Sequence, residues 1–267
     1  MSRIEATFRR CRQEGRIALA AYLTAGYPTV ADTLPLVEAL VEGGFDLVEL
    51  GVPFSDPLAD GATIQRASQQ ALANGITVAR CLELAAALRQ AVPAPLILMG
   101  YFNPFFRYGL GRLAADASAA GVAGFIVPDL APEEADEMAA ALAGRGIDRV
   151  GLVAPTSSAG RIAKVAGQAS GFVYCVALAG VTGARREVSA ELAPFLSLVR
   201  RHTTLPLAVG FGLSRPEHMA AVARIADGAV VGSAIIDLID SVAPGERAAA
   251  LRRFAASLRA ASRLAEA

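Results

Sequence analysis

The chain has 267 residues, of which 54% are hydrophobic, and its 25 basic and 25 acidic residues give a formal net charge of zero. This length suits one α/β barrel, and the balanced charge without a basic stripe argues against nucleic acid or a membrane surface as a partner. No uninterrupted apolar stretch reaches the ~20 residues of a membrane span. The first residues lack the apolar core of a signal peptide, so we expect a cytoplasmic protein.

Short apolar runs alternate with helical stretches along the chain. The runs are nearly continuous in hydrophobicity, as is typical of parallel strands covered on both faces. The eight predicted strands span 17–24, 45–50, 95–99, 124–127, 149–154, 171–176, 206–210 and 228–231.

Stretches rich in Ala, Leu, Arg and Glu predict the helices between these strands. They span 2–14, 32–42, 62–74, 78–89, 111–120, 132–143, 158–166, 189–202 and 214–223, with a short helix after Ser233 and a C-terminal helix from Gly245 to about Leu264. Ser214 and Glu217 predict a capping box, with Pro216 near the first helical position. Eight strand-then-helix units without a polar linker predict one (β/α)₈ TIM-barrel domain over residues 1–267, with an extra N-terminal helix and a short helix after the eighth strand.

Active sites of such barrels lie at the carboxyl ends of the strands and in the loops that follow, and two acidic residues are predicted there. Glu49 closes the apolar run 45–50, and Asp60 follows in the Gly/Pro-rich loop 52–61. A carboxylate at the exit of a buried strand costs folding free energy unless it is paired or used. Two carboxylates in different surroundings suit acid/base work; the alternative is a satisfied core acid and an aspartate that stabilises a turn. We expect desolvation to raise the pKa of Glu49, whereas Asp60 stays ionised in a wetter loop.

Glycine clusters follow three late strands, at 180–183, 210–214 and 232–233. Glycines after the seventh and eighth strands let backbone N–H groups approach an anion, and a helix beginning at Ser233 would direct its positive end to the same place. The three clusters together favour a phosphate site over simple turns. The aromatic residues near strand ends form either ordinary core or a flat apolar pocket; they are Tyr22, Tyr101, Phe102, Tyr174 and Phe211.

The sequence lacks well-placed residues for several kinds of catalytic or metal site. The only lysine, Lys164, falls in a predicted surface helix, which argues against a Schiff base inside the barrel. The two histidines, His202 and His218, fall near or within helices, which argues against a His-rich metal site. The three cysteines show no metal or disulfide spacing, and Cys175 is interpreted as a core residue. We therefore expect a carboxylate pair, an aromatic pocket and a phosphate cradle that work without a cofactor.

The segment 49–65, ELGVPFSDPLADGATIQ, closely resembles the signature of the tryptophan synthase alpha chain family. Motifs of that family also stand, in its order and spacing, at 21–28, 101–104, 128–130, 180–183, 210–212 and 232–234. The resemblance implies the lyase reaction that splits indole-3-glycerol phosphate into indole and glyceraldehyde 3-phosphate in tryptophan biosynthesis. It also implies a hetero-oligomer, an alpha-beta-beta-alpha heterotetramer with a beta chain that carries pyridoxal phosphate.

The same resemblance implies roles for individual residues. Glu49 would transfer protons to indole C3 and from the glycerol hydroxyl, and Asp60 would bind the indole N–H. Thr182 would bond to Asp60 when the loop 180–183 closes. The implied substrate-binding residues are Tyr22, Tyr101, Tyr174, Thr182, Gly183, Phe211, Gly212, Gly232 and Ser233. Ala177, Ala179 and Ala131 depart from the family pattern, the first two beside the closing loop.

Two other functions stay open at this point. One is a catalytically silent subunit that only binds and activates a beta chain. Such a subunit would need neither Glu49 nor Asp60, so the presence of both acids argues against it. The other is another phosphate-binding barrel enzyme, such as a pathway isomerase or indole-glycerol-phosphate synthase. The synthase would be expected to need a cationic acid inside its barrel, so the lack of a well-placed lysine disfavours it. Segments 53–57 and 103–106, expected as loops, and Pro132 are predicted to form the partner surface at the same rim.

Overall fold

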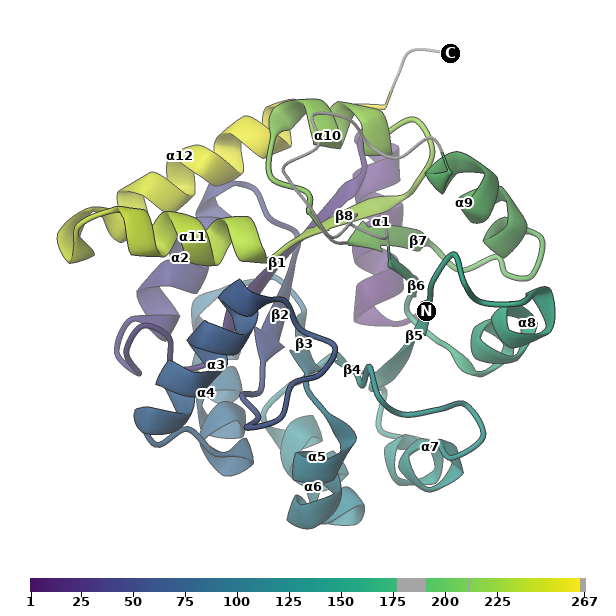
Figure 1. Cartoon of the computed structure of the whole chain (residues 1–267), viewed down its shortest axis with the longest axis horizontal. Coiled ribbons are helices and arrows are strands. Elements are labelled where there is room, and N and C mark those ends of the chain that lie inside the picture. The colour runs from purple at the N-terminus through teal and green to yellow at the C-terminus, as the bar shows by residue number, and fades with distance from the viewer. Residues whose placement is uncertain (177–190, 211, 265–267) are drawn as a thin grey trace.

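Eight parallel strands form a closed barrel in a computed structural model that describes residues 1–176, 191–210 and 212–264 (Figure 1). Each strand pairs with the next one along the chain, and the eighth pairs with the first. The TIM-barrel prediction is confirmed, and every predicted strand is found within two residues of its expected ends. The strands are β1 (Ala18–Thr24), β2 (Leu47–Gly51), β3 (Leu96–Met99), β4 (Gly124–Ile126), β5 (Asp148–Val153), β6 (Val173–Val176), β7 (Leu207–Gly210) and β8 (Gly228–Val231).

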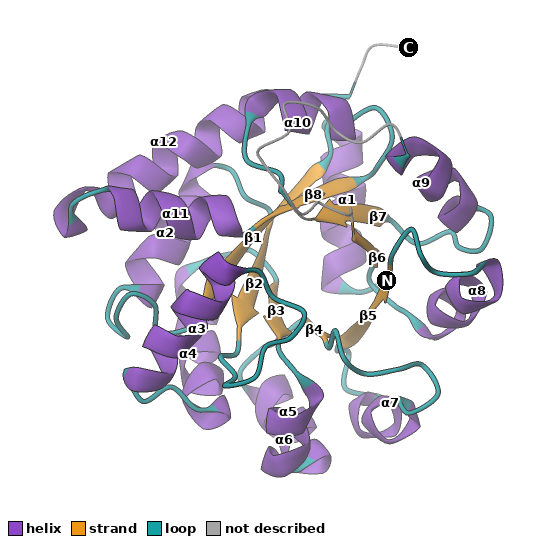
Figure 2. Ribbon diagram, in the orientation of Figure 1, coloured by secondary structure: helices purple, strands orange, loops and turns teal. Residues whose placement is uncertain are grey.

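Helices surround the barrel, as Figure 2 shows. They are α1 (Arg3–Gln13), α2 (Thr33–Gly43), α3 (Ala62–Ala73), α4 (Val78–Ala91), α5 (Phe102–Tyr108), α6 (Leu110–Ala119), α7 (Asp136–Leu142), α8 (Ala159–Gln168), α9 (Leu192–Arg200), α10 (Pro216–Val222), α11 (Ser233–Ser241) and α12 (Arg247–Ala260), with a 3₁₀ turn at Pro244–Glu246. Within the described ranges, no single helix is both long and apolar enough to cross a membrane. Helices α3 and α4 have the necessary length and composition only when counted together, and a bend of 99° separates them.

Two local predictions were wrong. Residues 103–106, expected as a loop, belong to α5. Pro104 is compatible with that helix because it falls in the first turn, where its missing N–H leaves no helical bond unmade. The capping box at Ser214 does not form: Arg215 is the N-cap and makes no side-chain bond, while the Ser214 N–H donates to Nδ1 of His218 at 3.1 Å.

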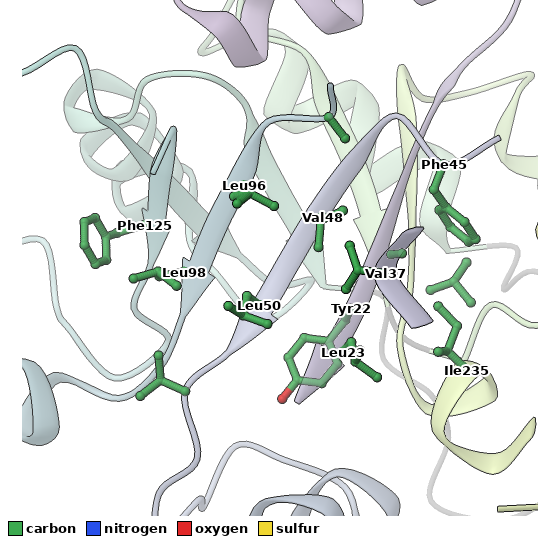
Figure 3. Close-up of a cluster of buried hydrophobic side chains, with 14 of the residues drawn as sticks. Tyr22, Leu23, Val37, Phe45, Val48, Leu50, Leu96, Leu98, Phe125 and Ile235 are labelled. Atoms are coloured by element: carbon green, nitrogen blue, oxygen red, sulfur yellow. The ribbon is translucent and has the colours of Figure 1, made fainter. Parts of the chain in front are cut away.

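The side chains of each strand divide between two apolar layers, because successive residues point to opposite faces. Figure 3 shows part of the outer layer, in which Val48 and Leu50 of β2 lie beside Leu96 and Leu98 of β3. The inner layer fills the barrel itself. The cysteines Cys11, Cys81 and Cys175 are all buried and free, which confirms the reading of Cys175 as a core residue.

Helix α1 closes the amino-terminal mouth of the barrel. Its Ile4, Phe8 and Cys11 belong to the same apolar cluster as the barrel interior. The Phe8 ring lies 5.4 Å from that of Phe172, just before β6. A small molecule must therefore reach the interior from the opposite mouth, where the carboxyl ends of the strands and their loops lie.

A buried ion pair joins the amino ends of the first two strands. Arg16, before β1, contacts Asp46, before β2, through two parallel bonds of 2.6 and 2.7 Å. Both side chains are only 5% exposed. Asp46 also accepts the backbone N–H of Leu19 in β1 at 3.0 Å, so its carboxylate ties the start of β2 to the start of β1.

We expect Asp46→Ala to lower the free energy of unfolding by about 3–5 kcal/mol, because it removes the buried carboxylate that accepts two bonds from the Arg16 guanidinium and leaves only the half-exposed Glu14 to balance its charge. Urea-induced unfolding followed by circular dichroism measures the loss. Glu83→Ala breaks the exposed Arg80–Glu83 pair and should change stability by no more than about 0.5 kcal/mol. Equal losses in the two variants would contradict the role given to Asp46.

Candidate active site

Glu49 lies at the centre of β2 and not, as predicted, at its exit. The strand continues to Gly51 because that residue still pairs in register with Thr24 of β1 and Met99 of β3. Glu49 is itself the register partner of Tyr22 and Ile97. Since Leu47 belongs to the inner apolar layer and side chains alternate, Glu49 also points into the barrel.

The Glu49 carboxyl group is fully buried, and neither of its oxygens has a hydrogen-bond partner within the described part of the chain. Burial raises its pKa to about 8, as predicted in direction. No neighbouring cation offsets this cost of charging a group away from water. At neutral pH the group is therefore mostly protonated, and it can act as an acid inside an apolar barrel.

Asp60 lies in the loop between β2 and α3 and is half-buried, so it is less exposed to solvent than predicted. Burial raises its pKa to about 6, while a hydrogen bond with the Tyr101 hydroxyl works against that rise. The same hydroxyl accepts the Ala59 N–H at 2.9 Å. Asp60 is thus mostly ionised at pH 7, where Glu49 is mostly protonated.

Two buried tyrosines from opposite sides of the barrel approach the carboxyl groups. Burial raises the pKa of Tyr174, and the nearby Glu49 raises it further. Burial and Asp60 act in the same way on Tyr22. Both hydroxyls therefore stay protonated, which makes these rings neutral walls of the site.

Glycines make room for these rings, a role that the sequence reasoning missed at Gly51. A Cβ at Gly51 would overlap the Tyr22 hydroxyl, and a Cβ at Gly210 would overlap that of Tyr174. The signal was present in the sequence: Gly51 stands two residues after Glu49 and so faces the same interior.

Three of the predicted phosphate residues, Gly212, Gly232 and Ser233, follow the carboxyl ends of β7 and β8, which are paired neighbours. Gly212 has a φ of 71°, in the left-handed region that glycine tolerates. Gly232 immediately precedes α11 and Ser233 begins it, so the first N–H groups of this helix lack intrahelical acceptors. Gly232 also lies against Tyr22, because an added Cβ would be 3.3 Å from the Cβ of that tyrosine. An anion can thus be held close to the aromatic walls.

The remaining sequence predictions divide into two groups. Thr182, Gly183, Phe211, Ala177 and Ala179 lie outside the described residues. Lys164 lies on the surface of α8, as predicted, and pairs with Glu133 at 2.8 Å. His202 follows α9 and His218 lies within α10, both away from strand ends as predicted. In the described ranges, no group of three or more His, Cys, Asp or Glu side chains could hold a metal ion.

The raised pKa of the buried Glu49 predicts that the free energy of unfolding depends on pH. Its folded pKa of about 8 exceeds the ordinary value of 4.5, so the folded state binds more protons than the unfolded state between these values. Stability due to this group is therefore fully present below about pH 4.5 and is lost as pH rises to about 8, at about 1.4 kcal/mol per pH unit. Glu49→Gln removes this slope, and its advantage over the wild type should grow across that range.

Urea unfolding curves at half-unit steps from pH 5 to 8 measure the difference between the two proteins. Comparison of variants cancels the groups that both share. Glu83→Gln, at an exposed position on α4, should parallel the wild type. A constant difference between wild type and Glu49→Gln would show that Glu49 is not held protonated by burial.

Known proteins similar to this chain share one description. The family model described as tryptophan synthase alpha chain matches residues 8–265. The tryptophan synthase alpha chain of Roseiflexus castenholzii (strain DSM 13941 / HLO8) is 55% identical over 260 residues, which cover 97% of this chain and 100% of that protein. That of Chloroflexus aggregans (strain MD-66 / DSM 9485) is 55% identical over 248 residues, covering 92% and 93%.

Solved structures agree with these relatives. Tryptophan synthase from M. tuberculosis, in an aminoacrylate-bound form, has a chain that superposes with a TM-score of 0.89 at 36% identity, covering 98% of this chain and 100% of that one. Tryptophan synthase subunit alpha from Legionella pneumophila str. Paris superposes with a TM-score of 0.89 at 36% identity and covers 98% of each chain.

Proposed function

This chain belongs to the tryptophan synthase alpha chain family, and on that premise we propose that Glu49 and Asp60 perform the retro-aldol cleavage of indole-3-glycerol phosphate to indole and D-glyceraldehyde 3-phosphate. The observation that carries the proposal is the unpartnered carboxyl group of Glu49 inside the barrel, with a pKa about two units above that of Asp60. Two carboxyl groups held in different protonation states at one pH are the arrangement that acid/base catalysis requires.

Breaking the bond between indole C3 and the glycerol carbon requires a place for its electron pair. The substrate supplies this place itself once its ring is protonated. Glu49 donates its proton to C3, which turns the indole into an indolenine cation. The carboxylate that remains then takes the proton of the adjacent glycerol hydroxyl. As that oxygen forms the aldehyde C=O, the bond to C3 breaks, its electrons return to the indole ring, and Glu49 is protonated again.

Asp60 has the complementary role. Positive charge develops on the indole nitrogen when C3 is protonated, and an ionised carboxylate next to the N–H stabilises it. Its lower pKa keeps Asp60 charged while Glu49 is protonated. Tyr101 supports this role, because its hydroxyl bonds to both Asp60 and the Ala59 N–H and thereby orders the loop.

The rest of the site orients the substrate. Tyr22 and Tyr174 pack against the indole, and the backbone at Gly212, Gly232 and Ser233 holds the phosphate at the start of α11. We assign Phe211 to the indole pocket, Thr182 to the loop that closes on Asp60, and Gly183 to the phosphate site. The reaction needs no cofactor in this chain.

We expect the purified chain to release indole from indole-3-glycerol phosphate, with an increase when a beta chain is added. Glu49→Gln should lower kcat by at least about 100-fold, since amides do not transfer the proton. For the wild type, kcat/KM should fall as pH rises through about 8, where the donor form of Glu49 is lost. A colorimetric assay for indole measures both effects.

Each other outcome has its own meaning. No release even with the beta chain would support the silent subunit or a different phosphate substrate. Release that survives Glu49→Gln would keep the enzyme and overturn the mechanism. A profile without ionisation between about pH 5 and 9 would remove Glu49 as the acid.

We further propose that the chain works in the cytoplasm, in an alpha-beta-beta-alpha heterotetramer whose beta chain carries pyridoxal phosphate. Two large apolar side chains support a partner surface at this rim: Leu58 is 94% exposed in the loop after β2, and Phe106 is 53% exposed on α5 after β3. Neighbouring exposed apolar groups are typical of protein interfaces. Segments 53–57 and 103–106, together with Pro132, extend this surface.

Phe106→Ser and Asp56→Ala should each weaken retention of the protein on an immobilised beta chain, because they remove contacts at the proposed surface. Leu72→Ser is a matched control, since Leu72 is also exposed but lies near the end of α3. Quantitative pull-down measures the three variants together. Unchanged retention of Phe106→Ser and Asp56→Ala would remove these segments from the interface.

A further inference from the structure

Matching pairs of side chains join α3 and α11 on their facing surfaces. Thr63 and Arg66 lie one turn apart on α3, and Asp237 and Asp240 lie one turn apart on α11. The Thr63 hydroxyl donates to Oδ1 of Asp237 at 3.1 Å. The Arg66 guanidinium lies 2.5 Å from Oδ2 of Asp240 and 3.7 Å from Oδ1 of Asp237. Figure 1 shows the two helices side by side.

The turn after β1 is the third member of this network. Tyr27, which is buried, donates its hydroxyl proton to Oδ1 of Asp240. Asn74, which ends α3, donates to the carbonyls of Gly26 and Pro28 at 2.9 and 2.8 Å. Both ends of α3 are therefore held in place. Its first turns bond to α11, and its C-cap residue bonds to the turn after β1, which itself bonds to α11 through Tyr27.

The two aspartates are not explained by the stability of α11 itself. Aspartate is a poor helix former, and Asp240 stands next to the last residue, Ser241, at the negative end of the helix dipole. The apolar face of α11, made by Ile235, Ile236 and Ile239, is buried against the barrel. Since exposed ion pairs add little stability, the value of this network lies in the fixed register of the two helices.

We propose that this α3–α11 clamp, formed by Tyr27, Thr63, Arg66, Asp237 and Asp240, is a positioning device that couples phosphate binding at the start of α11 to the placement of Asp60. The inference rests on the proposed function for the roles of Ser233 and Asp60. Helix α11 begins at Ser233, and α3 begins two residues after Asp60.

The coupling follows from rigid helices joined in register. A helix drawn toward a bound phosphate at its first turn carries its later residues with it. Asp237 and Asp240 transfer that displacement to Thr63 and Arg66 in the first turns of α3, and hence to the loop that ends at Asp60. The non-reacting phosphate group thereby contributes to catalysis, because its binding energy sets the geometry of a group that acts on the indole.

Hydrogen exchange with sn-glycerol 3-phosphate as the probe tests the coupling directly. In the wild type, the probe should slow exchange of the amides at 62–66 in α3 as well as those at the start of α11. Arg66→Met should bind the probe at least as tightly as the wild type, since binding energy is no longer used to position α3. It should lose the effect in α3 only, while Arg66→Lys keeps most of it. Arg80→Met, which breaks an equally exposed pair on α4, should behave as the wild type.

Steady-state kinetics gives the second readout. Arg66→Met should lower kcat for indole release by about tenfold with little change in KM, since Asp60 is misplaced but the phosphate is still held. Thr63→Val, which keeps the side-chain shape, should give a smaller loss in the same direction and serves if Arg66→Met folds poorly by circular dichroism.

The outcomes separate this inference from the proposed function. An inactive wild type overturns the function, and the exchange experiment still tests the clamp. The clamp is wrong if the probe leaves α3 unchanged in the wild type, if Arg66→Met keeps the α3 response, or if Arg80→Met loses kcat equally. An active wild type with an equally active Arg66→Met overturns the clamp alone.

Discussion

The rest of the site depends on one carboxyl group that is buried without a partner. The closed parallel barrel fixes which residues of each strand face inward, and in β2 this places Glu49 among apolar neighbours. No cation and no donor lowers the cost of charging it within the described residues. The proton is therefore retained at neutral pH, and the fold itself creates an acid from a residue that would be ionised in water.

A buried ion pair lies at one end of the barrel, and an unpaired buried acid lies toward the other. At the amino end, the Arg16–Asp46 pair makes two short parallel bonds and ties two strands together. Toward the carboxyl end, Glu49 is left unpaired, and the space around it is shaped by tyrosines that lean over Gly51 and Gly210. The paired charges at the amino end stabilise the fold, whereas the unpaired acid that we propose to react is energetically unfavourable.

The sequence allowed the barrel and its eight strands to be predicted because buried parallel strands are continuous apolar runs. The position of Glu49 within β2 could not be predicted, since the ladder to Met99 and Thr24 that extends the strand is a contact between distant residues. The partial burial of Asp60 and its hydrogen bond with Tyr101 could not be predicted for the same reason, since they involve residues distant in the sequence. Helix α5 was missed because Pro104 is common in loops, and the Ser214 cap failed because its N–H bonds to the His218 ring.

The plug formed by α1 has a consequence for the strength of the acid. Ile4 and Phe8 pack into the inner apolar layer from the amino-terminal mouth and so keep solvent from entering the barrel there. If this helix loosened, water could reach the underside of Glu49, and its proton affinity would fall toward that of a free glutamate. A helix at the far end of the barrel thus affects the pKa of Glu49, and changes in the packing of that helix would alter the protonation of this proposed acid.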